Sequence, residues 1–463
     1  MKKRNSGWKV IALLLSMAMI LGGCGSSEQE STVKEAEEAS ALNASEVQKD
    51  GESAESGEAA QDGADDQAKE EEAGQEDEAV QGSEDAQDSG IIIPELSIEQ
   101  SSIPDSEALE FVKNMKTGWN LGNTLDAFSG SSNAGLASET SWGNPETTKE
   151  MISAVKEAGF ETIRIPITWH NHLEWTEGSD EYTVSSEWLD RVQEVVDYAM
   201  DNDMYVIINI HHDTAEDVYY PDSAHYEQSE KYIVTVWEMV AERFKDYDEH
   251  LIFESMNEPR LVGSSYEWNF QESAQECKDS ADCINRLNQA FVDTVRKSGG
   301  SNAQRYLMVP GYAASPAGVT TDLYQLPQDS AENKLIVSTH AYTPYSFALQ
   351  PQSEGGSTDK FNAEGGTGRA EIDSLMSALY QKFVSQGIPV VMGEYGARNK
   401  NDNLQDRVNF YAYYIASARA KGITCCVWDN GAFAGNGEMF GILIRQKCIW
   451  AYPEVVEAIM KYA

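Results

Sequence analysis

Tyr205-Val-Ile-Ile-Asn-Ile210, followed at once by His211 and His212, is the stretch of this 463-residue sequence that decides the fold. Its almost unbroken apolar character is typical of a strand buried on both faces, as in a parallel sheet. Similar short runs recur along the chain. The eight runs that we interpret as strands span residues 117–123, 162–167, 205–210, 251–256, 305–309, 335–339, 389–392 and 423–428.

Stretches with a helical pattern alternate with these runs. The helix candidates span residues 145–158, 185–200, 227–244, 283–298, 370–386 and 404–421. Asn144 is the expected N-cap of the first. Repeated strand–helix units predict a parallel sheet. Eight of them in about 370 residues fit a closed α/β structure, a (β/α)8 or TIM barrel. An open doubly wound sheet is the competing architecture, but no strand is followed by its Gly-x-Gly-x-x-Gly turn.

Polar side chains stand where these strands would end. His211 and His212 follow the third run, Asn257 and Glu258 the fourth, and Glu394 the seventh. Other runs are followed by Asn123, by His340 and Tyr342, and by Trp428. In α/β barrels the active site lies at the carboxyl ends of the strands, where residues from several strands converge. The sequence therefore predicts an active site at this face.

Glu258 and Glu394 form the candidate catalytic pair, because the fourth and seventh strands would set them across the barrel mouth from each other. Two carboxyls about 5–5.5 Å apart suit a retaining glycosidase, and a wider gap suits an inverting one. One must stay protonated and the other ionised, so their surroundings must separate the two pKa values. A single glutamate at a strand end is more often an ion-pair partner or a helix cap. Two of them, each in a tight turn of small residues, favour catalysis.

Seven motifs carry a family resemblance over residues 105–460. In chain order they are Gly118-Trp-Asn-Leu-Gly-Asn-Thr-Leu-Asp-Ala127, Arg164-Ile-Pro166, Ile210-His-His212, Asn257-Glu-Pro259, His340-Ala-Tyr342, Gly393-Glu-Tyr-Gly396 and Trp428-Asp-Asn-Gly431. Together they resemble glycoside hydrolase family 5. The first and last resemble its subfamily 4, a group of endoglucanases, lichenases and xyloglucanases.

The resemblance implies a role for each motif residue. Glu258 would be the acid/base and Glu394 the nucleophile. Arg164 and Tyr342 can hydrogen-bond Glu394 and hold it ionised, and Asn257 can bond the sugar 2-hydroxyl. The remaining expected substrate-binding or supporting residues are Asn123, Asp126, His211, His212, His340, Trp428 and Asn430. The family needs no metal and no cofactor, and we expect neither here.

Several of these residues have structural alternatives. Arg164 could be a plain ion pair, Trp428 could belong to the core, and the segment 211–213 could suggest a metal site, although no carboxylate pattern completes it. Four other tryptophans stay undecided between core and sugar subsite: Trp119, Trp142, Trp169 and Trp175.

The chain begins like a lipoprotein signal peptide, over residues 1–23. A basic start and an apolar run lead into Leu21-Gly22-Gly23-Cys24, which is a secretory pattern too short for a comfortable membrane span. The last four residues resemble a bacterial lipobox, so Cys24 is the expected lipid attachment site. An ordinary signal peptide is the alternative. Residues 24–90 lack aromatic residues and are rich in Glu, Asp and Ser, which predicts a disordered acidic linker before a catalytic domain at 91–463.

The formal net charge of −43 argues against nucleic acid as a partner, but it does not repel a neutral polysaccharide. Membrane contact is expected only through the lipid anchor, and the protein is expected to be a monomer. Cys277 and Cys283 lie close together in a polar stretch. An exported protein permits a disulfide between them, and we consider one plausible.

These observations predict a secreted, surface-anchored retaining endo-β-1,4-glucanase that acts on cellulose and related β-glucans. A xyloglucanase or lichenase, or less favourably a mannanase, could use the same site. A non-catalytic glycan-binding surface protein would have to lack a catalytic residue, and both glutamates are present. A solute-binding lipoprotein would need two lobes, which eight barrel strands do not supply.

Overall fold

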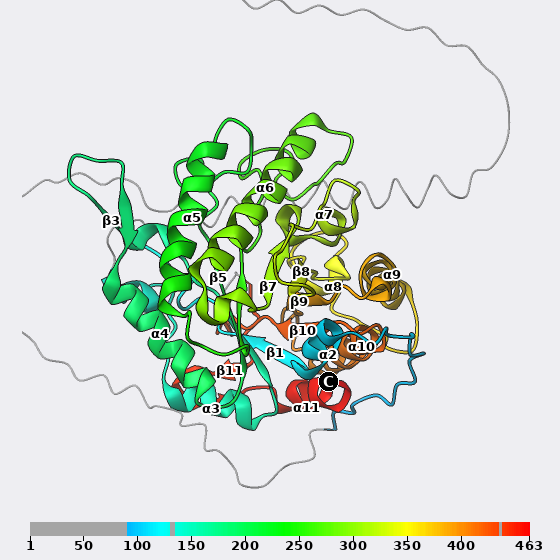
Figure 1. Cartoon of the computed structure of the whole chain (residues 1–463). Coiled ribbons are helices and arrows are strands. Elements are labelled where there is room, and N and C mark those ends of the chain that lie inside the picture. Colours follow the sequence, from blue (N-terminus) through cyan, green and yellow to red (C-terminus); the bar gives the residue numbers. More distant parts are fainter. Residues whose placement is uncertain (1–89, 130–134, 435–437) are drawn as a thin grey trace, which may run out of the picture.

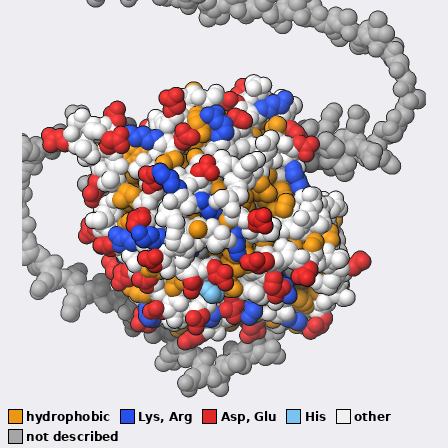
Figure 2. Space-filling view, viewed as in Figure 1, with side chains coloured by type: hydrophobic (Ala, Val, Ile, Leu, Met, Phe, Trp, Pro, Cys, Tyr) orange, Lys and Arg blue, Asp and Glu red, His pale blue; other side chains and the backbone are white. Residues whose placement is uncertain are grey.

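The computed structural model describes residues 90–129, 135–434 and 438–463. The expected signal peptide, Cys24 and nearly all of the acidic linker therefore lie outside the described residues. Within the described parts of the chain, no helix is both long enough and apolar enough to cross a membrane. On the face drawn in Figure 2, acidic and basic side chains are interspersed.

Eight parallel strands close into a barrel in the order β1-β10-β9-β8-β7-β6-β5-β2, and β1 pairs with both β10 and β2. Each strand falls within or overlaps one of the eight expected runs, so the predicted α/β barrel is confirmed. The barrel strands are β1 (Thr117–Asn120), β2 (Thr162–Ile165), β5 (Tyr205–Asn209), β6 (Leu251–Glu254), β7 (Leu307–Pro310), β8 (Leu335–His340), β9 (Val390–Tyr395) and β10 (Thr424–Val427).

Helices surround the barrel (Figure 1). Those of eight or more residues are α2 (Glu107–Asn114), α3 (Lys149–Glu157), α4 (Ser186–Met200), α5 (Tyr226–Arg243), α6 (Gln275–Ser298), α9 (Thr367–Lys382), α10 (Leu404–Ala420) and α11 (Pro453–Tyr462). Two shorter ones are α7 (Pro316–Thr320) and α8 (Tyr345–Ala348). Two small antiparallel hairpins, β3 (Leu173–Trp175) with β4 (Tyr182–Val184) and β11 (Leu443–Ile444) with β12 (Ile449–Trp450), lie outside the barrel.

Two helix starts differ from the sequence prediction by four residues or more. Helix α3 begins at Lys149, and the side chain of Thr148 caps it by accepting a hydrogen bond from the Met151 amide. Asn144, which we expected as the cap, instead donates to the backbone carbonyls of Asn123 and Asn430. Helix α6 begins at Gln275, earlier than expected.

The early start of α6 rules out the disulfide between Cys277 and Cys283. Both residues lie inside this helix and both are free and buried. Six positions of an α-helix span about 9 Å along its axis, whereas bridged cysteines have Cα atoms about 4.4–6.8 Å apart. The disulfide prediction is therefore wrong.

The barrel interior is built in layers. The lowest layer is an apolar cluster in which Ile207, Ile252 and Ile336 meet Phe111 of α2. Phe111 stacks on Tyr306 with ring centroids 3.7 Å apart, so α2 closes this end of the barrel. Because side chains alternate along a strand, the residues two positions further on also point inward. These residues form a polar layer of Asn120, Arg164, Asn209, Glu254 and Ser338.

A bulge in β9 sets the direction of Glu394. Thr339 of β8 pairs with Met392, but the next residue, His340, pairs with Glu394, so Gly393 is an extra residue in β9. An extra residue reverses the inward–outward alternation from that point on. Glu394 therefore turns into the barrel, and Tyr395 turns outward to stack on Tyr414 of α10 at 4.6 Å.

Candidate active site

Arg164 lies at the centre of the site and is fully buried. Its Nε donates to Glu254 Oε2 at 2.8 Å and its Nη1 to Glu394 Oε1 at 2.8 Å. Further hydrogen bonds run from the guanidinium to the amide oxygens of Asn120 and Asn257, at 3.0 and 2.8 Å. Burial by itself would lower the pKa of Arg164, but the charges of Glu254 and Glu394 outweigh burial and raise it. The positive charge is thus fixed beneath the site.

Glu254 is the second half of this buried ion pair, and the sequence analysis missed it. Its carboxylate accepts from Arg164, from Asn209 Nδ2 at 2.9 Å and from the Ser338 hydroxyl at 2.5 Å. A charged residue inside the apolar run 251–256 was the available signal. The alternative of a plain ion pair for Arg164 is therefore half right, since Arg164 pairs with a structural carboxylate and with Glu394.

Glu394 is almost buried, with 5% of its surface exposed. Oε1 accepts from Arg164, and Oε2 accepts from the Tyr342 hydroxyl at 2.9 Å. Both hydrogen bonds expected from the sequence are present. Burial, with the charge of Glu394, raises the pKa of Tyr342 well above its usual value. The hydroxyl therefore stays protonated and remains a donor.

Glu258 shares a hydrogen bond with His340, whose Nδ1 lies 2.9 Å from Glu258 Oε1. Burial would raise the pKa of Glu258, but the hydrogen bond and charge of His340, with Arg260 and Arg164 beyond it, lower it. Burial would likewise lower the pKa of His340, but Glu394 and Glu258 raise it. A carboxylate oxygen of Glu258, one of Glu394 and a ring nitrogen of His340 all lie within 4.8 Å of one another.

Gly393 makes room for the His340 ring. A Cβ added at this position would lie 2.8 Å from His340 Nε2 and 3.5 Å from Arg164 Nε. The Nε2 atom is buried and has no hydrogen-bond partner among the described residues. A doubly protonated ring would bury one unpaired N–H, which is costly. This cost opposes the charges of Glu394 and Glu258, which favour protonation of the ring.

His211 lies beside Glu394, and Trp428 lies beside His211. Asn209 Nδ2 donates to His211 Nδ1 at 3.1 Å, so the ring proton sits on Nε2, 4.0 Å from Glu394 Oε1. Burial lowers the pKa of His211 well below its usual value, so the ring is neutral. It lies parallel to the Trp428 ring with centroids 5.9 Å apart. Gly122 lets Trp428 approach, since a Cβ there would lie 2.7 Å from the indole.

Asp126 and His212 form a second pair next to His211. Asp126 is buried, its Oδ1 accepts from the Thr124 amide, and its Oδ2 lies 3.5 Å from His212 Nε2. Asp213, by contrast, accepts from the Trp169 amide and the Tyr232 hydroxyl. One ligand atom from each of Asp126, His211 and His212 lies within 4.8 Å of the other two. The expectation that no carboxylate completes a group with this pair is therefore wrong, although the carboxylate is Asp126 and not Asp213.

Asn123 and Asn430 order the loops around the site. Asn123 has a left-handed backbone (φ 55°) and accepts from Asn144 through its carbonyl. The Asn430 side chain donates to the Glu438 carbonyl and accepts from the Ala432 amide. The contacts of both residues hold the backbone in place.

The four undecided tryptophans divide evenly. Trp119 and Trp169 are buried, and their indole nitrogens donate to Asp429 and to the Asn209 carbonyl. Trp142 and Trp175 are 40% and 63% exposed. The first two belong to the core, and the last two can meet a ligand.

Two carboxylates at the carboxyl ends of barrel strands, close enough to flank one sugar bond, define a glycosidase type of site. The family model for cellulase, glycosyl hydrolase family 5, matches residues 126–434. The chain belongs to glycoside hydrolase family 5 and is a glycoside hydrolase.

Named relatives agree with this assignment. Endoglucanase B of Ruminococcus albus is 43% identical over 80% of this chain and 85% of its own length. A family 5 lichenase from Caldicellulosiruptor sp. F32 is 56% identical, with a TM-score of 0.78 over 80% of this chain and 99% of that one. A GH5-4 broad specificity endoglucanase from Ruminococcus champanellensis with bound cellotriose is 43% identical, with a TM-score of 0.70 over 78% of this chain and 100% of that one.

The Arg164–Glu254 pair can be tested by replacing Glu254 with Gln. We expect the free energy of unfolding to fall by about 3–5 kcal/mol, because a buried charge loses its partner. Thermal or urea unfolding would measure the loss. Glu110→Gln is the matched control, since Glu110 pairs with Lys113 on the surface. A Glu254→Gln protein as stable as the control would contradict the dependence of Arg164 on Glu254.

The Gly393 bulge can be tested with Gly393→Ala. The added Cβ would push the His340 ring away, and a displacement of about 1 Å near the reacting atoms costs about 100-fold in rate. Steady-state kcat/KM on a soluble glycan substrate measures the effect. Gly355→Ala is the control, because nothing lies within 4 Å of a Cβ there. Equal kcat/KM for the two variants would show that the ring has room to spare.

Proposed function

We propose that this protein is a retaining endo-β-1,4-glucanase, with Glu394 as the nucleophile and Glu258 as the acid/base. The observation that carries the proposal is the short gap between the two carboxylates, which have oxygens within 4.8 Å of each other. Retaining enzymes hold their carboxyls about 5–5.5 Å apart, whereas inverting enzymes leave about 6.5–9.5 Å for a water molecule. The gap here lies below the range of inverting enzymes and favours retention.

In the first step, Glu394 attacks the anomeric carbon and the bond to the leaving sugar oxygen breaks. Arg164 and Tyr342 together occupy both carboxylate oxygens as donors. These two donors fix the direction of attack. One lone pair of Glu394 then forms the glycosyl–enzyme bond, and the departing chain takes a proton from Glu258.

The supply of that proton depends on His340. Glu258 and His340 share one proton. Because the pKa of Glu258 is lowered and the pKa of His340 is raised, this proton rests on the His340 side of the hydrogen bond. As negative charge develops on the leaving oxygen, the proton moves along the 2.9 Å hydrogen bond to Glu258 and on to that oxygen. In the second step, Glu258 takes a proton from water, which attacks the anomeric carbon and releases Glu394.

Asn257 is oriented for the substrate. Its amide oxygen accepts from Arg164 at 2.8 Å, which leaves the amide nitrogen as the group to contact the sugar. A hydrogen bond to the sugar 2-hydroxyl that strengthens in the transition state supplies further stabilisation.

The proposed substrates are cellulose and related β-glucans, cut at internal β-1,4-glucosidic bonds. The relatives named endoglucanase and lichenase support this class. Mixed-linkage glucan and xyloglucan remain candidates for the preferred polymer, and mannan is a weaker one. We also propose that the protein acts outside the cell as a monomer held by a lipid on Cys24, on the strength of the Leu21-Gly22-Gly23-Cys24 pattern and the acidic segment after it.

Product analysis of the purified protein on carboxymethyl cellulose, lichenan, xyloglucan and mannan tests the proposal. We expect internal cleavage of the β-glucans and first-formed products with retained anomeric configuration by NMR. Glu394→Gln should lose nearly all turnover. Glu258→Ala should lose about 10²–10⁴-fold, the usual share of general acid–base catalysis.

Glu110→Gln, a surface change, is the control for these two variants. Inverted products would overturn the assignment of Glu394 as the nucleophile. Folded protein that binds glucan without cutting it would replace the enzyme by a surface-binding function.

The shared proton can be tested with His340→Asn. In the wild type, activity should fall at alkaline pH as the pair loses its proton, above the raised pKa of His340. Without the imidazole, Glu258 alone holds the proton. Since carboxyls titrate at lower pH than imidazoles, the alkaline limb of kcat/KM should move to lower pH. A pH profile with an unmoved alkaline limb would mean that His340 does not hold the proton.

A further inference from the structure

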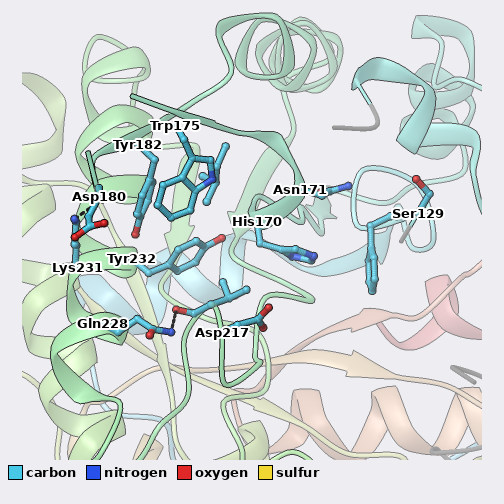
Figure 3. A pocket seen from close by; sticks show the side chains of 13 residues that line it. Ser129, His170, Asn171, Trp175, Asp180, Tyr182, Asp217, Gln228, Lys231 and Tyr232 are labelled. Carbon is cyan, nitrogen blue, oxygen red and sulfur yellow. Dashed lines mark hydrogen bonds between the residues drawn. The ribbon is translucent and has the colours of Figure 1, made fainter. Parts of the chain in front are cut away.

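A cavity of about 690 Å³ lies beside the active site and takes no part in the mechanism above (Figure 3). Its walls come from the segments that follow β1, β2 and β5, and from the β3–β4 hairpin and α5. The carboxyl ends of barrel strands share one face, so the cavity opens on the same side of the barrel as Glu258 and Glu394. Its size is within the range of about 300–1,000 Å³ that small-ligand sites occupy.

Aromatic rings provide one kind of surface in this cavity. Trp175 at the end of β3 is 63% exposed, and its ring meets that of Tyr182 at 4.7 Å. Figure 3 shows both rings close to Tyr232, with His170 towards the other side. The Tyr232 hydroxyl is held by Asp213 at 2.9 Å, and Asp213 also holds His170. Asp213 thus fixes the positions of Tyr232 and His170.

The polar groups of the cavity favour a ligand that carries hydrogen-bond donors. Lys231 Nζ already donates to the Asp180 carbonyl at 2.6 Å and pairs with Glu181 at 3.4 Å, and Gln228 Nε2 donates to two backbone carbonyls. The side-chain carboxylates of Asp180 and Asp217 accept no hydrogen bond from any described residue. Two carboxylates disfavour an anion, and free acceptors beside exposed rings suit the hydroxyls and C–H faces of a neutral sugar.

Phe128 connects the cavity with the active site. Its ring lines the cavity and lies 5.2 Å from His170, and on its other side it lies 6.2 Å from His212. His212 in turn contacts His211, the neighbour of Glu394. The exposed Trp142 contacts both Phe128 and His212, at 5.4 Å each. A glycan bound at the two glutamates can therefore continue over exposed rings into the cavity.

We propose that this cavity is a distal saccharide site, which binds a neutral sugar unit of the glucan remote from the bond that is cut. The inference rests on the proposed function. The sugar is either a backbone unit further along the strand or a branch on it, and both offer the same hydroxyls. The site adds affinity for long or branched substrates, and a short substrate does not reach it.

The test compares kcat/KM on an aryl cellobioside, on linear cellohexaose and on a xyloglucan oligosaccharide. For Trp175→Ala and for Asp217→Asn, on opposite walls, we expect the ratio of long-substrate to short-substrate kcat/KM to fall about tenfold, equivalent to about 1.4 kcal/mol. A loss on cellohexaose assigns a backbone unit, and a loss confined to the xyloglucan oligosaccharide assigns a branch. Ile449→Ala, an exposed apolar side chain on β12, is the control and should keep the wild-type ratio.

Ratios equal to wild type for both variants overturn the distal site, while Glu258 and Glu394 variants that lose activity in the same assays leave the proposed function standing. If the wild type hydrolyses none of the three substrates, the proposed function fails. A binding measurement then tests whether the cavity is a saccharide site. Calorimetry with cellohexaose and the xyloglucan oligosaccharide should show a Kd about tenfold weaker for Trp175→Ala than for wild type, and equal affinities or no binding would overturn the site.

Discussion

The ion pair of Arg164 with Glu254 and Glu394, buried in the barrel, is the interaction on which the rest of the structure depends. Burying three charges costs several kcal/mol each unless every charge is paired and hydrogen-bonded. Here each group has those partners: the guanidinium donates to four residues, and Glu254 accepts from three. A network satisfied to this degree is rigid. Glu394 is therefore held in one orientation by the donors Arg164 and Tyr342.

The layers below and above the pair explain why it can exist. The apolar cluster that includes Phe111 excludes water from one end of the barrel. Two residues further along each strand, side chains from four other strands complete the polar layer around Arg164. The extra residue at Gly393 then turns Glu394 inward, where regular alternation would have pointed it out. A glycine is needed there because the His340 ring occupies the space where a Cβ would lie. The bulge at Gly393 and the buried charge of Arg164 thus both determine the position of the Glu394 carboxylate.

The sequence predicted what is local or repeated, and it missed what depends on distant contacts. The eight strands followed from short apolar runs, and most site residues followed from their place at strand ends. Glu254 looked like one more residue of an apolar run, because its partners Arg164 and Ser338 are far away in the sequence. The cysteine pair looked bridgeable because nothing local showed that α6 begins at Gln275. Asn144 looked like a helix cap because its real acceptors, the carbonyls of Asn123 and Asn430, are brought close only by the closed barrel.

The division between barrel and loops also separates chemistry from substrate choice. The groups proposed to make and break bonds stand on strands or directly after them, and their positions are fixed by the buried network. The cavity lined by Trp175, Tyr182 and Asp217 is built from a hairpin, a loop and one end of a helix, which share no hydrogen bond with Arg164 or its carboxylates. Loops of this kind tolerate substitution better than a packed barrel does. If the cavity is the proposed saccharide site, changes in it would alter which glucan is bound, and over what length of chain, without moving the two carboxylates.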